Sequence, residues 1–81
     1  MKVYNKIVNK CIKYTQDKQY GINIKNKTIT VSSFPNLTGE KIVKEIEEII
    51  FQEINKKETN IDKYFISNDI ETVSVKMYIK E

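Results

Sequence analysis

The stretch from Thr38 to Lys57 is the longest regularly patterned segment of the chain, and it predicts a central amphipathic helix. Pro35 disfavours a helical conformation in the residue before it, and Thr38 is a suitable N-cap. Leu37 and Ile42 occupy the two positions of a hydrophobic staple. The apolar residues recur at intervals of one, three and four, which forms one stripe at 3.6 residues per turn: Ile42, Val43, Ile46, Ile49, Ile50 and Ile54.

Two residues of this helix break its pattern. Glu53 falls inside the apolar arc, and we expect it to lie near the helix end, where it can reach water or Lys57, because buried carboxylates are rare. Phe51 falls outside the arc. It is either covered by the segment that follows the helix or exposed as an aromatic anchor for a partner protein.

A second helix is predicted from Lys2 to about Asp17, where apolar residues come in neighbouring pairs four apart. Lys18 would project into that apolar face, so the helix should end just before it, with Gly21 as a break. Cys11, the single cysteine, lies on the apolar face and is interpreted as a small core residue. The opposite side carries a stripe of four lysines: Lys2, Lys6, Lys10 and Lys13.

Alternating segments predict the strands. Ile22 and Ile24 should pair with Val31 and Ile29 across a two-residue turn at Asn26-Lys27. Residues 61–67 are either a short strand or a helical turn, Ser67-Asn68-Asp69 reads as a turn, and 70–79 is the clearest strand. The last strand presents Lys76 and Tyr78 on its polar side and is a candidate free sheet edge.

The element order indicates an α+β fold in one domain spanning residues 1–81. Two helices would cover one face of a three- or four-stranded antiparallel sheet, in the order α-β-β-α-(β)-β. Lys6-Ile7-Val8 and Lys41-Ile42-Val43 begin the two helices and hint at a duplicated helix–strand–strand unit, although the match is weak in so Ile- and Lys-rich a chain. No segment has the length of a membrane span or the apolar core of a signal peptide, so we expect a cytoplasmic protein without membrane contact.

The composition argues against most catalytic chemistry. The chain has no histidine and one cysteine, which removes Ser-His and Cys-His nucleophile pairs and zinc knots. The only glycines are Gly21 and Gly39, so no Gly-rich phosphate loop exists. We therefore expect a non-enzyme without a cofactor or metal.

Charge asymmetry is the strongest positive signal. All fourteen basic residues are lysines, and seven of them lie in residues 1–27 with Asp17 as the only acid. The leading hypothesis is a protein-binding module that docks on a larger partner, such as a phage-type inhibitor of a nucleic-acid-handling protein. The alternatives are a direct nucleic-acid binder that uses the lysine-rich N-terminal helix and a self-assembling structural subunit. The candidate binding residues are Lys2, Lys6, Lys10, Lys13, Lys25, Lys27, Phe51, Lys76 and Tyr78.

Overall fold

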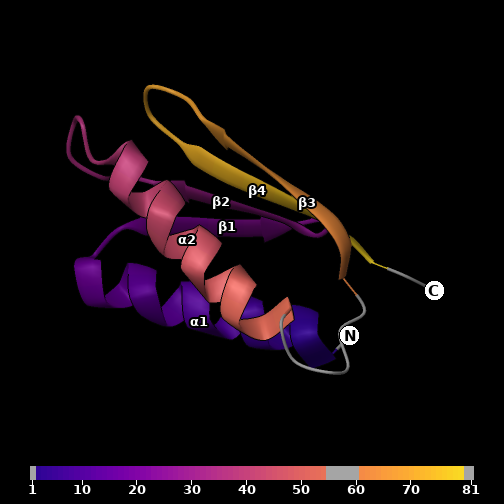
Figure 1. Ribbon diagram of the computed structural model, residues 1–81. Coiled ribbons are helices and arrows are strands. Elements are labelled where there is room, and N and C mark those ends of the chain that lie inside the picture. Colours follow the sequence, from indigo (N-terminus) through magenta and orange to yellow (C-terminus); the bar gives the residue numbers. More distant parts are fainter. Residues whose placement is uncertain (1, 55–60, 80–81) are drawn as a thin grey trace.

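A computed structural model describes residues 2–54 and 61–79 and confirms the α+β class. Both helices lie on the same face of a four-stranded antiparallel sheet (Figure 1). Residues 61–67, for which the sequence left two alternatives, are a strand. The elements are α1 (Lys2–Lys18), β1 (Gly21–Lys25), β2 (Thr28–Ser32), α2 (Gly39–Ile54), β3 (Ile61–Asn68) and β4 (Val73–Ile79).

The sheet order is β1-β2-β4-β3, so the chain contains two successive helix–hairpin units whose second strands meet in the centre. The prediction of β4 as a free edge is wrong, because β4 pairs with β2 on one side and β3 on the other. Its inward residues Val73, Val75 and Met77 are almost completely buried, as a central strand requires. Among the described strands, β1 and β3 form the edges.

The strand predicted from residue 70 begins at Val73, and the turn lies later than Ser67-Asn68-Asp69. Asn68 still pairs with Val73, and the Asp69 N–H donates to the Thr72 carbonyl at 2.8 Å, which closes the connection. Tyr64 and Ile66 share the inward face with Val73, as the alternation predicted.

The β1–β2 hairpin has the predicted register, with Ile24 opposite Ile29 and Ile22 opposite Val31. Asn26 and Lys27 form the turn with φ angles of 53° and 60°. Positive φ at both central residues is the requirement of the type I′ turn, whose twist matches that of the strands.

Helix α1 continues through Lys18, one residue beyond the predicted end, and stops in a Schellman motif. Gln19 has a φ of 61° and donates its N–H to the Gln16 carbonyl at 3.1 Å, while the Tyr20 N–H donates to the Thr15 carbonyl at 2.8 Å. Gln19 therefore ends the helix, and Gly21, the predicted break, is instead the first residue of β1.

Helix α2 begins at Gly39, with the Thr38 carbonyl accepting the Ile42 N–H at 3.1 Å, which is the N-cap position. The predicted staple does not form, because Leu37 is fully exposed while Ile42 is buried. A β-carbon at Gly39 would meet the Asn68 side chain, so a larger residue at this position would displace that side chain. The predicted helical residues 55–57 lie outside the described part of the chain.

The expectation that Glu53 reaches water near the helix end is wrong, since only 1% of the residue is exposed. Its Oε1 lies 3.0 Å from the Lys10 Nζ of α1, so the carboxylate links the two helices where an exposed position was expected. Lys57, the partner named from the sequence, lies outside the described residues. The surrounding core comprises Val3, Tyr4, Ile7, Cys11, Ile29, Val31, Ile42, Ile46, Ile50, Ile61, Val73, Val75 and Met77.

Candidate functional site: the outer face of the sheet

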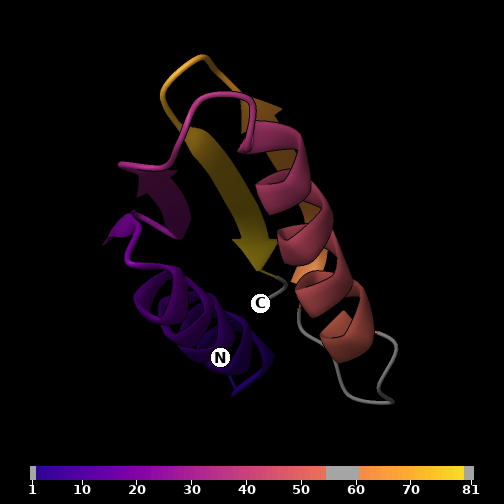
Figure 2. The same ribbon diagram turned by 90° about the vertical axis from the view of Figure 1, so that its left-hand side faces the viewer.

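Both helices cover one side of the sheet, and no described element covers the other side (Figure 2). We call this second side the outer sheet face. The strand registers define it, because cross-strand partners point to the same side. Its paired positions beyond Gly21 and Ser32 are Asn23, Lys25, Thr28, Thr30, Lys63, Phe65, Ser67, Ser74, Lys76 and Tyr78.

Two aromatic rings form the apolar part of the outer sheet face. Phe65 of β3 and Tyr78 of β4 meet edge to face, with ring centroids 5.8 Å apart and an interplanar angle of 88°. Phe65 remains 58% exposed and Tyr78 37% exposed. A side chain of this size left in water on a strand is available to a flat ligand, and the perpendicular arrangement leaves the rings accessible from different directions.

Lysine ammonium groups surround these rings. The Lys63 Nζ lies 5.1 Å from the Tyr78 ring centroid and 5.9 Å from that of Phe65, and the Lys76 Nζ lies 5.4 Å from the Tyr78 ring. These distances are those of cation–π contacts. Both cations are therefore held beside an aromatic surface.

A polar hollow of about 380 Å³ continues the face toward β1. Thr30 and Ser74 contribute hydroxyl groups beside it, with their oxygens 3.4 Å apart. None of the register-paired positions of the outer sheet face carries a carboxylate. The hollow is lined by Asn23, Lys25, Asn26, Thr28, Thr30 and Lys76.

The structure thus places three of the candidate residues together on this face: Lys25, Lys76 and Tyr78. Lys27 lies at its margin, in the β1–β2 turn, where its carbonyl accepts the Met77 N–H at 3.1 Å. Sequence reasoning missed Phe65 and Lys63. The signal was present, because Tyr64 and Ile66 on the inward face put their odd-numbered neighbours on the outer one.

The lysine stripe of α1 is separate from this face, since α1 belongs to the layer that covers the opposite side of the sheet (Figure 2). Lys6 and Lys13 are exposed. Lys10 is paired with the buried carboxylate of Glu53. Lys2 lies in α1, but its side chain is outside the described set.

Phe51 also lies apart, on the solvent side of α2, and is 60% exposed. It borders a shallow cleft of about 560 Å³ together with Glu47, Glu48, Gln52 and Tyr64. The segment suggested as its cover, which follows the helix, lies outside the described residues. In the described structure Phe51 is thus an exposed aromatic residue.

The remaining reactive groups lie away from these surfaces. Cys11 is buried in the core, as predicted, and burial raises the pKa of its thiol to about 11, so the thiol is protonated at neutral pH. Burial likewise raises the pKa of the Tyr4 phenol. In residues 2–54 and 61–79, no cluster of three or more acidic, cysteine or histidine side chains could hold a metal ion. Neither described helix combines the length and hydrophobicity needed to cross a membrane.

Comparison with known proteins found no match: no protein-family model matches the chain, and no curated protein or solved structure matches it significantly.

Proposed function

We propose that the protein binds single-stranded nucleic acid on the outer sheet face. The observation that carries this proposal is the juxtaposition of Phe65 and Tyr78 with the ammonium groups of Lys63 and Lys76. Open antiparallel sheets with exposed aromatics stack unpaired bases, and neighbouring cations neutralise phosphates.

The chemistry of the face favours a single strand over a duplex. A base can lie on an aromatic ring only when it is unpaired and its flat surface is accessible. The face also lacks arginine, which supplies the commonest specific base contact in the major groove of DNA. Binding through stacking and lysine contacts should therefore tolerate many sequences.

The polar hollow extends the proposed nucleic-acid-binding surface beyond the two aromatic rings. Lys25 and Lys76 line it together with the Thr28 and Thr30 hydroxyls, which donate hydrogen bonds to phosphate oxygens readily. A single-stranded nucleic acid that runs from the Phe65 ring into the hollow would pass from a stacking surface to a cationic one.

Fluorescence anisotropy with labelled single-stranded DNA, RNA and duplex DNA tests the proposal at about 50 mM salt. We expect Phe65→Ala and Tyr78→Ala each to weaken single-strand binding about 5- to 150-fold, the equivalent of one lost base stack. Both side chains are exposed enough that circular dichroism should show an unchanged fold.

Two matched controls locate the site. Phe51→Ala removes an exposed aromatic from α2, and Lys6→Gln/Lys13→Gln removes two exposed charges from α1. Neither variant should change single-strand affinity by more than about twofold. Phe51 lies apart from the outer sheet face, and the distant exposed charges of α1 are screened by salt. If the α1 variant weakens binding while Phe65→Ala has no effect, the sheet face is not the site.

A protein-binding function is the second candidate, and the exposure of Phe51 beside its cleft favours it. The partner would be a larger protein, including one whose nucleic-acid site this chain blocks as an inhibitor. Undetectable binding of every oligonucleotide at low salt would favour this candidate. A Phe51→Ala variant that retains every partner recovered by the wild type would remove Phe51 as the anchor.

A further inference from the structure

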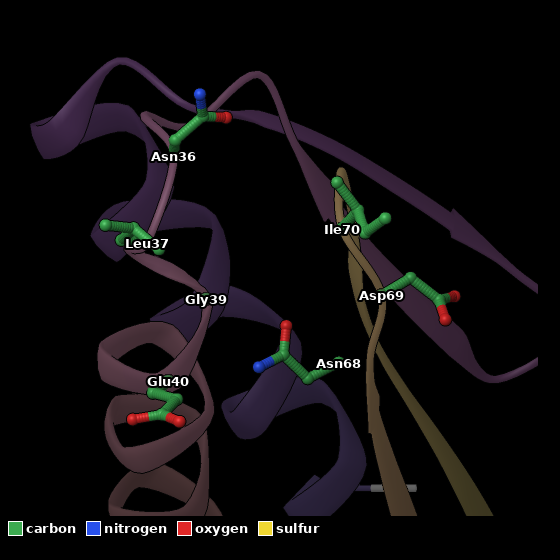
Figure 3. A pocket seen from close by; sticks show the side chains of 7 residues that line it. All are labelled: Asn36, Leu37, Gly39, Glu40, Asn68, Asp69 and Ile70. Atoms are coloured by element: carbon green, nitrogen blue, oxygen red, sulfur yellow. The ribbon is translucent and has the colours of Figure 1, made fainter.

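One end of the molecule displays two large aliphatic side chains in water. Leu37 is fully exposed and Ile70 is 91% exposed. They come from the β2–α2 and β3–β4 connections, which flank the start of α2 (Figure 3). We call this end the tip, defined by residues 36–40 and 68–71; it encloses an open cleft of about 780 Å³.

The tip is held in shape by contacts that do not bury these two side chains. The Asn68 side chain, at the end of β3, lies against Gly39 in the first turn of α2 (Figure 3), and the Asp69 N–H donates to the Thr72 carbonyl at 2.8 Å. Leu37 has a φ of 67°, a conformation that costs a leucine about 1–2 kcal/mol. The Thr38 N–H donates to the Pro35 carbonyl at 3.2 Å and closes the turn that holds Leu37 in this conformation. The turn leaves the Leu37 side chain in water, where together with Ile70 it forms an apolar surface that a second molecule can cover.

Charge identifies a complementary surface. Glu40, Asp69 and Glu71 are exposed in the tip, whose residues 36–40 and 68–71 contain these three acids and no base, while Lys18, Lys41 and Lys44 border Leu37 on its other side. The outer sheet face presents lysines around two aromatic rings and has no carboxylate at its register-paired positions. One surface therefore offers apolar side chains beside three acids, and the other offers aromatic rings flanked by two lysines.

The two surfaces also lie at different places along the β3–β4 hairpin. The tip includes the connection of this hairpin, whereas Lys63 and Tyr78 pair toward its opposite end. Five residues of strand separate Asn68 from Lys63, which is about 17 Å. One molecule could use both surfaces at once.

We propose that the tip of one molecule docks on the outer sheet face of a second copy. Leu37 and Ile70 would cover the Phe65 and Tyr78 rings, while the acidic side chains approach Lys63 and Lys76. Such a contact joins two different surfaces, so it is heterologous and extends head to tail. Because single-stranded nucleic acid would occupy the same face, the two ligands should compete.

Sedimentation equilibrium without nucleic acid tests the proposal, from about 10 to about 500 µM protein, the range of a weak complex. At about 50 mM salt we expect the average mass to rise above the monomer mass of 9.6 kDa, and to fall back toward it as salt screens the charges.

Two variants each remove one surface. Leu37→Asn/Ile70→Asn removes the tip, and Lys63→Gln/Phe65→Ser removes the face; all four side chains are exposed, so the fold should persist by circular dichroism. Each variant alone should be monomeric. An equimolar mixture should form a discrete dimer, because one variant keeps the face and the other keeps the tip.

Three results would overturn the proposal. If the wild-type protein stays monomeric at the highest concentration, the tip does not bind a second copy, and a molecule that covers it would be a different protein. A wild type that associates while one of the variants also associates alone would show that like surfaces pair, and a wild type that associates while the mixture stays monomeric would show that the tip and the face do not contact each other. None of these results affects the binding of oligonucleotides by the outer sheet face, since these measurements contain none, so the two proposals fail independently.

Discussion

The helical pattern of α2 places the Glu53 carboxylate among isoleucines, and in the structure this side chain is buried on that face. The carboxylate is removed from water and lies 3.0 Å from the Lys10 ammonium, whose side chain is 45% exposed. Removing the cation from a buried carboxylate lowers the stability of the fold, whereas replacing both partners by apolar residues of similar size often does not. The contact therefore favours this packing of α1 on α2 mainly because other arrangements would separate the buried carboxylate from the Lys10 ammonium.

This asymmetry gives a prediction for urea unfolding followed by circular dichroism. Lys10→Met should lower the free energy of unfolding by about 2 kcal/mol, because it leaves the Glu53 carboxylate buried without this cation. The double variant Lys10→Met/Glu53→Met should recover most of that loss. Lys6→Met, at an exposed position of the same helix, serves as the control and should change stability by less than about 0.5 kcal/mol. A double variant less stable than Lys10→Met would contradict the argument.

At the scale of elements, the β1–β2 turn was predicted at the correct residues, whereas the β3–β4 connection was placed too early. The β1–β2 register followed from the alternation of isoleucine and polar residues on either side of Asn26-Lys27. The end of α1 was less clear, because the residue with positive φ is Gln19 rather than a glycine. Two backbone hydrogen bonds hold Gln19 in that conformation. The sequence gives no sign of such a residue.

Gln19→Gly should therefore stabilise the protein by about 0.5–1 kcal/mol, since glycine adopts a positive φ without steric cost but loses more backbone entropy on folding. Gln16→Gly is the matched control: the residue is exposed and three positions earlier within α1, where glycine should cost about 1 kcal/mol. Thermal unfolding of both variants measures the difference. Equal effects would mean that the left-handed conformation of Gln19 carries no strain.

At the scale of the whole molecule, the charge is distributed over two separate surfaces. Folding carries Lys25 and Lys27 to the sheet region where Lys63 and Lys76 lie, although these residues are distant in the sequence. The exposed lysines of α1 remain on the helical layer. A count of charges along the chain therefore does not identify the cationic surface.

If four lysines contact phosphates, the logarithm of the single-strand binding constant should fall with the logarithm of salt concentration at a slope of about −2.8. Affinity should then drop about 50-fold between about 50 and about 200 mM salt. Lys76→Gln should reduce the slope by about 0.7, and Lys13→Gln on α1 should leave it unchanged. Equal slopes for the two variants would remove the outer sheet face as the phosphate-binding surface. Anisotropy titrations across salt concentrations provide the measurement.

The sequence by itself determined the α+β class, both helices, the first hairpin and the buried thiol of Cys11, because these follow from local periodicity and residue type. Only the tertiary structure decided that β4 is central, that Glu53 pairs with Lys10, and that Phe65 meets Tyr78 beside Lys63 and Lys76. Those features depend on which strands pair and how the helices lie across the sheet. Such contacts join residues far apart in the chain, and the pattern of either partner alone does not specify the other.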